Sequence, residues 1–339
     1  MSPILECIPN FSEGKDQSVI DAIAAEISAV SQVALLHVDT SAAANRTVMT
    51  FAGEPEAVTE AAFRAMRKAA ALIDMRQQAG VHPRIGATDV CPLVPLYGID
   101  MAEADTLAQQ LAARVGAELQ VPVYLYEHSQ PRAYRRALPD IRKGQYEGLA
   151  TRMQQPEWQP DYGPANLDTH AGATVLGARK ILVAFNISLA TADIELAHAI
   201  ARQIRSSGYT RTVSGQKEKI PGLLPALRAI GWYMADYGQA QVSFNLLDYT
   251  VTSPLQVWRS CRQLAEDAGV ALAGSEVIGL IPEQCLLEAG AYALGVTATD
   301  SDKKRLITAA IELLGLDRLK AFNPDEKVLE YALAAKGLL

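Results

Sequence analysis

The sequence predicts an α+β fold of two similar half-domains, each with the element order βαββαβ. Short apolar runs of strand length alternate with longer segments in which apolar residues recur every three or four positions. This order occurs twice, once on each side of a polar segment near the middle of the 339-residue chain. A chain of this length favours two compact domains, and we expect them at 1–180 and 181–339.

The first βαββαβ unit lies between residues 4 and 96. Apolar runs give its strands, and helical spacing of apolar residues gives its two helices. Pro55 stands in a first helical turn, where proline is tolerated. The expected strands are 4–8, 33–38, 46–51 and 90–96, the expected helices are 19–30 and 55–73, and a turn at 39–45 joins the second and third strands as a hairpin.

The middle of the chain is less regular. Asp100 is suited to cap a further helix. The apolar run 121–126 predicts a strand, and the proline within this run places the strand near the edge of a sheet. Residues 127–179 are rich in Pro, Gly, Arg, Gln and Tyr and mostly lack periodicity, with a turn or two of helix expected within 137–150. A segment of that length without regular structure is usually functional or a linker.

The second unit repeats the first. Ser253, Pro254 and Gln256 form a capping-box pattern with proline at the first helical position. The expected strands are 181–187, 227–234, 240–247 and 271–281, the helices begin near Asp193 and Ser253, a loop covers 214–221, and C-terminal helices follow at 282–291, at 302–314 and from 323.

Two βαββαβ units suggest ferredoxin-like half-domains, each an antiparallel sheet with its helices on one face. The apolar side chains on the other face of each sheet must also be shielded from water. We therefore expect the two sheets to face each other across a substrate cleft or tunnel, with the segment 127–179 along it.

Composition narrows the class of partner. The chain has 31 Lys and Arg against 38 Asp and Glu, a net charge of −7, which argues against a nucleic-acid partner and favours a small molecule. Four widely spaced cysteines (Cys7, Cys91, Cys261, Cys285) suggest neither a zinc site nor a disulfide framework. No apolar run approaches the roughly 18 residues that span a bilayer. We expect a cytoplasmic protein without a membrane partner.

The strongest candidate for chemistry is His82. It stands among glycines beside Pro83 and Arg84, just before an apolar strand. Imidazole gives and takes a proton near neutral pH, the glycines permit close approach to a ligand, and Arg84 carries a carboxylate-binding fork. A histidine that only bonds the loop backbone is the alternative.

Other candidates fall in neighbouring loops. Asp39 could orient the His82 imidazole or simply begin the hairpin turn. Arg46 and Asn10 could reach the same opening of the expected substrate cleft and bind substrate carboxylates. His37 and Asp39 share a strand face, but no second group of ligands accompanies them, so we expect no metal site.

The polar middle segment holds two further features. Its glycines near His170 match neither a phosphate loop nor a G-x-G-x-x-G fingerprint. Its positive charges form either a solvated helix face or a strip that attracts a multiply anionic ligand. These charges are Arg132, Arg135, Arg136, Arg142 and Lys143.

Several ordered motifs resemble the glutamate formiminotransferase family, from about residue 4 to residue 331. They are ECIPNFSEG at 6–14, HPRIGATDVCP at 82–92, VPVYLY at 121–126, GATVLGARK at 172–180 and NLLD at 245–248.

The resemblance implies a folate-dependent transfer of a formimino group between N-formimino-L-glutamate and N5 of tetrahydrofolate in histidine degradation. It places the catalytic histidine at His82, and it implies a homodimer and a separate cyclodeaminase. Tetrahydrofolate is then a co-substrate, and no metal is implied. The implied folate-binding residues are Gly163, Pro164, Ala165, Asn166, Leu167, Asp168, Thr169, His170, Ala171 and Gly172.

Amidine chemistry then suggests a role for His82. The attacking amine must lose a proton and the departing nitrogen must gain one, and one imidazole can do both. Two other functions stay open: transfer of formyl from 5-formyltetrahydrofolate, and folate binding without turnover.

Overall fold

The computed structural model describes residues 2–167, 169–213, 216–297 and 302–339. The chain divides into two compact units, unit 1 with residues 1–180 and 333–339, and unit 2 with residues 181–332. The last seven residues, which we expected in the second domain, therefore group with the first unit. The mixed helix and strand composition that the sequence predicts is confirmed.

Unit 1 contains one large sheet with helices packed against it. Its strands are β1 (Ile4–Cys7), β2 (Asn10–Phe11), β3 (Val33–Ser41), β4 (Arg46–Gly53), β5 (Thr88–Tyr97), β6 (Val123–Leu125) and β7 (Thr174–Ala178). Its longer helices are α1 (Gln17–Ser28), α2 (Pro55–Leu72) and α3 (Met101–Arg114), followed by a π-helical turn (Val115–Leu119). The polar segment adds α4 (Leu138–Ile141), α5 (Gln145–Met153) and short 3₁₀ turns at Glu127–Ser129, Ala133–Arg135 and Pro156–Trp158.

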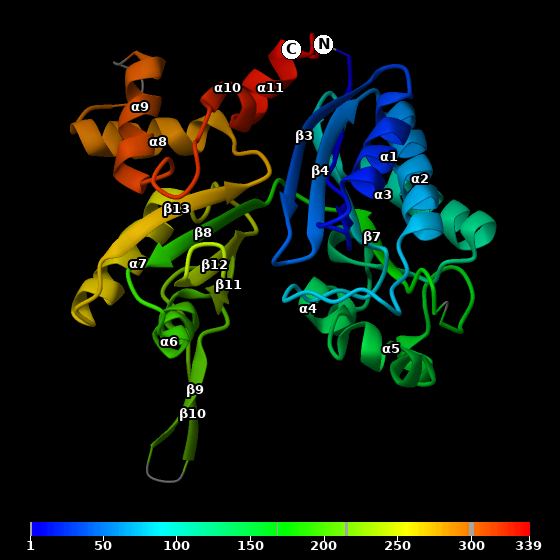
Figure 1. Ribbon diagram of the computed structural model, residues 1–339, viewed down its shortest axis with the longest axis horizontal. Helices are drawn as coiled ribbons and strands as arrows, with labels where there is room; N and C mark the ends of the chain where they lie inside the picture. Colours follow the sequence, from blue (N-terminus) through cyan, green and yellow to red (C-terminus); the bar gives the residue numbers. More distant parts are fainter. Residues whose placement is uncertain (1, 168, 214–215, 298–301) are drawn as a thin grey trace. The chain divides into compact units, whose positions relative to one another are not determined.

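The sheet of unit 1 is antiparallel in its first half and parallel in its second. The order β3-β4-β1/β2-β5 is antiparallel throughout, and β7 and β6 then extend it parallel to β5. Helices α1 and α2 lie side by side against β3 and β4 (Figure 1). Alternate residues such as Leu5, Cys7, Met49 and Phe51 join these helices in one apolar core. On the opposite face, at β5 to β7, a second apolar cluster includes residues of α4 and α5.

The helix boundaries follow the capping residues in the sequence. Asp100 forms a complete capping box with Glu103 at the start of α3, and Pro55 occupies the first turn of α2. In unit 2, Ser253 and Gln256 form the expected capping box. These expectations are confirmed because capping depends on residues only three positions apart.

Unit 2 is a second α+β unit. Its four-stranded antiparallel sheet has the order β11-β12-β8-β13. Its strands are β8 (Val183–Leu189), β9 (Tyr209–Val213), β10 (Gln216–Ile220), β11 (Leu227–Met234), β12 (Gln239–Leu246) and β13 (Leu272–Ile278). Its helices are α6 (Ile194–Ile204), α7 (Pro254–Asp267), α8 (Glu283–Leu294), α9 (Lys303–Leu314), α10 (Pro324–Lys327) and α11 (Leu329–Ala335), the last of which continues into the residues grouped with unit 1.

Three elements differ from expectation. Strand β7 lies within the segment expected to be irregular, and it inserts between β5 and β6. The expected loop at 214–221 is largely strand β10, which pairs with β9 in a two-stranded sheet that extends from the rest of unit 2 (Figure 1). Residues 214 and 215 lie outside the described residues. Strand β3 runs through Asp39 to Ser41, so Asp39 does not begin the turn.

Two further features were searched for among the described residues, a membrane-spanning helix and a metal-binding cluster. None of their helices combines the length and apolarity needed to cross a bilayer. No cluster of three or more His, Cys, Asp or Glu side chains suited to a metal ion occurs among them either.

Candidate active site

His82 lies in the loop between α2 and β5, in unit 1. The loop is tied to the β3–β4 turn through Asn45, whose side-chain amide donates to the Ala79 carbonyl at 2.9 Å. The Gln78 amide donates in turn to the Asn45 carbonyl at 3.0 Å. Asn45 also accepts from the Gly14 N–H at 3.0 Å. Three loops that are distant in sequence therefore meet around His82.

The His82 side chain contacts a guanidinium group. Its Nε2 lies 2.5 Å from Nη1 of Arg46, the first residue of β4. A guanidinium group has only donors, so the ring nitrogen must accept this hydrogen bond and carry no proton. His82 is therefore a neutral imidazole in this arrangement.

Burial and positive charge favour this neutral state. Burial is the larger cause that holds the pKa of His82 well below its usual value, followed by the charges of Arg46 and Arg142. A hydrogen bond to the Pro83 backbone acts in the opposite direction. Burial and the charge of Arg142 also lower the pKa of Arg46, to about 10. At neutral pH His82 is thus uncharged, with its Nε2 lone pair engaged by Arg46.

Arg84, expected as a carboxylate binder, is occupied within the protein. Its Nη1 and Nη2 donate to the two carboxylate oxygens of Glu147 at 2.9 and 2.7 Å. Its Nε donates to the side-chain oxygen of Gln78 at 2.6 Å. Its Nη2 also donates to the Gln78 carbonyl, and its Nη1 to the side-chain oxygen of Gln145. Because its donors are engaged, Arg84 joins the His82 loop to α5 and holds the loop in place.

Asp89 fixes the other end of the loop. This buried carboxylate accepts the Ile85 N–H at 2.9 Å and forms an ion pair with Arg142. Arg142 comes from the polar segment, 53 residues along the chain. Its charge also acts on His82 and Arg46. Apart from the presence of the two charges, no local pattern in the sequence predicts this ion pair.

Asp39 and Asn10 lie on the same sheet face. Strand register places Asp39 opposite Val48, which in turn pairs with Asn10. Asp39 lies 3.7 Å from the ring of His37 and contributes to the electrostatic environment of Arg46. The Asn10 amide donates to the Ile8 carbonyl. His82, Arg46 and their loop partners pack closely around a space too small to hold a water molecule. This His82 pocket is lined by Ser12, Ala44, Asn45, Arg46, Gln78, His82, Arg84 and Asp89.

The segment 163–172 ends against the His82 loop. Gly86 and Gly172 form an isolated antiparallel bridge, and the Ala87 N–H donates to the Ala171 carbonyl at 2.8 Å. The His170 ring contacts the Ala70 carbonyl at 3.0 Å, on α2. Asp168 lies outside the described residues. The structure therefore brings the end of this segment next to the loop of His82.

Gly172 allows this junction, and its replacement gives a test. Its φ of +74° is in the left-handed region, and a Cβ there would lie 2.4 Å from the Ile85 carbonyl oxygen. We expect Gly172→Ala to lower the free energy of unfolding by at least about 1–2 kcal/mol, and to lower kcat/KM as the loop shifts. Urea unfolding measures the first effect. Gly148→Ala on α5, where a Cβ meets nothing within 4 Å, is the control and should not be destabilising.

The positive strip is largely neutralised by the protein itself. Arg132 and Arg135 both pair with Asp161, and Arg142 pairs with Asp89. The Arg136 Nε donates to the Gln130 carbonyl at 3.1 Å. Arg142 therefore ties the polar segment to β5, and the buried Arg135 pairs within the segment. Arg132, Arg136 and Lys143 are exposed, as on a solvated face.

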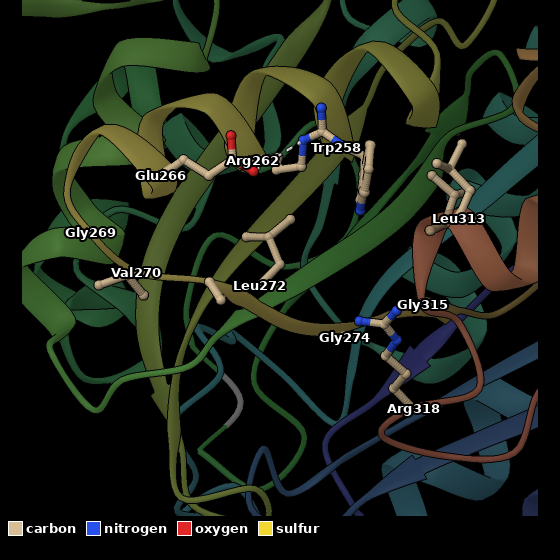
Figure 2. A pocket seen from close by; sticks show the side chains of 12 residues that line it. Trp258, Arg262, Glu266, Gly269, Val270, Leu272, Gly274, Leu313, Gly315 and Arg318 are labelled. Atoms are coloured by element: carbon tan, nitrogen blue, oxygen red, sulfur yellow. Dashed lines mark ion pairs between the residues drawn. The ribbon is translucent and has the colours of Figure 1, made fainter. Parts of the chain in front are cut away.

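A separate groove of about 390 Å³ occurs in unit 2, between α7, β13 and the end of α9. Figure 2 shows Leu272 between Arg262 and Arg318 in this groove. Arg262 lies 4.7 Å from the centroid of the Trp258 ring and pairs with Glu266 at 3.5 Å. The groove shares no lining residue with the His82 pocket.

Both units are similar to known proteins. Residues 4–179 match the N-terminal subdomain of the formiminotransferase domain, and residues 184–334 match the formiminotransferase domain. Glutamate formimidoyltransferase from Streptococcus pyogenes is 40% identical over 90% of this chain and 98% of its own length. The enzyme of the same name from Thermoplasma acidophilum is 36% identical over 88% and 94%.

Longer relatives also match. Formimidoyltransferase-cyclodeaminase from Rattus norvegicus is 43% identical over 99% of this chain, which spans 61% of that relative. The two subdomain matches together cover most of the sequence, and the match to the streptococcal protein runs over nearly its full length. The chain belongs to the formiminotransferase family.

Proposed function

We propose that this protein is a glutamate formimidoyltransferase, which moves the formimino group between N-formimino-L-glutamate and N5 of tetrahydrofolate in histidine degradation. The observation that carries the proposal is the neutral His82 imidazole, held 2.5 Å from Arg46 and beside the end of the segment 163–172. Relatives of similar length carry the same name.

The reaction needs one proton to change places. N5 of tetrahydrofolate attacks the formimino carbon and loses its proton, and the bond from that carbon to the glutamate nitrogen then breaks. The glutamate nitrogen must gain a proton as it leaves. His82 accepts the first proton as a general base and returns it as a general acid, so the proton count balances.

Arg46 has two roles in this proposal. Before substrate binds, its guanidinium occupies the lone pair on His82 Nε2. A substrate carboxylate is a stronger partner for a guanidinium group than a neutral ring nitrogen is. Binding of glutamate therefore draws Arg46 away and frees the imidazole to act as a base. Asn10 and Asp39 lie on the same sheet face and assist in placing the substrate and the ring.

This proposal predicts a pH effect for Arg46→Gln. Removing a positive charge in contact with His82 raises the pKa of the imidazole, because that charge disfavours the protonated ring. The protonated ring is no base, so the acidic limb of the kcat/KM profile should move to higher pH. We expect the His82 ring signals in NMR titration to move in the same direction. An unchanged titration would contradict the assigned contact.

Tetrahydrofolate as co-substrate fits the segment 163–172. The bridge between Gly86 and Gly172 supports this assignment, because it holds the end of the segment next to the His82 loop. Arg84 is proposed to serve this site by positioning the loop, and not as a carboxylate binder, because Glu147 and Gln78 occupy its donors.

The finer architecture is also proposed. The antiparallel order of β11-β12-β8-β13 supports a ferredoxin-like half-domain, and the order β3-β4-β1/β2-β5 supports a second. The proposal also includes a catalytic and folate-binding N-terminal subdomain at 1–180 and a C-terminal subdomain at 181–339. It further includes a homodimer, a cytoplasmic location and a separate cyclodeaminase partner.

A comparison of donors tests the function. Purified protein is mixed with tetrahydrofolate and N-formimino-L-glutamate, and the folate absorbance is followed. In a matched experiment 5-formyltetrahydrofolate and glutamate replace this pair. We expect kcat/KM to be higher with the formimino donor. A higher value with the formyl donor would assign the formyl reaction instead, and tight folate binding without turnover would make the protein a binding protein.

A further inference from the structure

The groove of unit 2 between α7, β13 and the end of α9 has an apolar floor. Val270, Leu272 and Leu313 pack against the core of unit 2 but stay partly exposed, and all three line the groove. The Trp258 side chain, which is 7% exposed, adds an aromatic wall. The volume of about 390 Å³ lies in the range of small-molecule sites in proteins. The groove therefore has the size and the apolar surface of a site for a small organic molecule.

Arg318 brings a positive charge to this groove. Its side chain lies against Gly315, where an added Cβ would be 3.1 Å from Arg318 Cδ. The Gly315 carbonyl accepts the Ser275 N–H at 2.9 Å, which ties this turn to β13. Figure 2 shows the guanidinium end of Arg318 turned toward the groove. No carboxylate of the described residues pairs with it, so its donors stay available to a ligand.

Arg262 adds a second guanidinium group, which is already compensated in charge. It lies over the Trp258 ring and pairs with Glu266 one helical turn further along α7. The two side chains of this pair are 45% and 55% exposed, so the pair is a surface one and holds Arg262 only weakly. Among the described residues that line the groove, no other side chain is charged. The lining therefore carries a net charge of +1.

We propose that this groove binds a small carboxylate with a single negative charge and an apolar body, such as an aryl-substituted or alkyl carboxylic acid. The planar fork of Arg318 matches the two oxygens of a carboxylate. The apolar body lies on Leu272 and against Trp258, where it is removed from water. One negative charge balances the charge of the lining, whereas a phosphate dianion would place a second negative charge near Glu266.

This inference does not rest on the proposed function. The groove lies wholly within unit 2, and it shares no lining residue with the His82 pocket. A failure of the transferase assay would therefore leave the inference intact, and a failure of binding in the groove would leave the proposed reaction intact.

Tryptophan fluorescence of the full-length protein tests the inference, with 4-phenylbutyrate as the probe. Trp258 lines the groove, and the other two tryptophans, Trp158 and Trp232, do not. We expect a saturable change in emission that Trp258→Phe removes. The uncharged 4-phenylbutanol and the dianionic 4-phenylbutyl phosphate have the same apolar body. Both should bind at least roughly tenfold more weakly than 4-phenylbutyrate, as measured by calorimetry.

Variants of Arg318 locate the charge that binds the probe. Arg318→Met keeps the apolar stem and removes the guanidinium, so the Kd for 4-phenylbutyrate should rise roughly ten- to hundredfold, the loss expected for a charged hydrogen bond. Arg318→Lys keeps the charge without the fork, and its Kd should lie between the two. Arg259→Met is the matched control, because Arg259 is exposed on α7 outside the lining, and its Kd should equal that of wild type.

Three results would overturn the inference. The first is the lack of saturable binding of 4-phenylbutyrate to the wild-type protein by both fluorescence and calorimetry. The second is an affinity for 4-phenylbutanol or 4-phenylbutyl phosphate that equals or exceeds that for 4-phenylbutyrate. The third is a wild-type Kd in Arg318→Met. Because Arg318 is exposed, this variant should fold, and an unchanged Tm confirms that a raised Kd reflects the lost guanidinium.

Discussion

Replacement of His82 by glutamine is expected to lower kcat by about 10²- to 10⁴-fold, the usual contribution of a positioned acid and base. Glutamine retains a hydrogen-bonding amide beside Arg46 but cannot carry the proton from folate N5 to the glutamate nitrogen. Because His82 lies in the loop between α2 and β5 and not in the apolar core of unit 1, the fold should survive. We expect the KM values to change little by comparison.

The control for this variant is His128→Gln. His128 is exposed in a 3₁₀ turn of the same unit and lies outside the His82 pocket. Its replacement should leave kcat at the wild-type level. Near-full turnover in a folded His82→Gln variant would show that another group moves the proton.

Loss of the Asp89 carboxylate is expected to have the largest effect on stability. Asp89→Ala leaves the guanidinium of Arg142, which is 14% exposed, without its partner and leaves the Ile85 N–H unpaired. Breaking a buried ion pair on one side typically costs about 3–5 kcal/mol in the free energy of unfolding. The His82 loop should loosen as well, and kcat/KM should fall with stability.

Two variants separate the causes of this loss. Asp89→Asn keeps an acceptor for the Ile85 N–H and removes only the charge, so its free energy of unfolding should fall less than that of Asp89→Ala. Asp74→Ala removes the partner of an exposed arginine, Arg76, and should change stability little. Equal unfolding midpoints for Asp89→Ala and wild type in urea would contradict the assigned role of Asp89.

Local patterns predicted most of the fold. Capping residues, apolar runs and turn residues act over a few positions, and they located the helices and most strands. Strand β7 was missed because its pairing with β5 joins Val90 to Val175, a partnership that no local pattern records. The β9–β10 hairpin was missed because its residues are polar and exposed, as in a loop.

The sequence predicts a chemical role for His82, and the structure adds contacts that the sequence does not predict. The motif around His82 identified the imidazole, since a histidine among glycines and beside an arginine is distinctive. The sequence could not predict that Arg84 would bind Glu147, 63 residues away, while Arg46 contacts the imidazole. The three-dimensional structure decides which of several arginines faces a given group.

The most direct test follows the transferred carbon itself. N-formimino-L-glutamate labelled with ¹³C at the formimino carbon is mixed with tetrahydrofolate and the protein, and ¹³C NMR follows the label. We expect the label to move to N5 of the folate in step with release of one glutamate per transfer, and His82→Gln to slow this movement by at least about 10²-fold. A label that stays on glutamate with the wild-type protein, or moves equally fast with His82→Gln, would contradict the account.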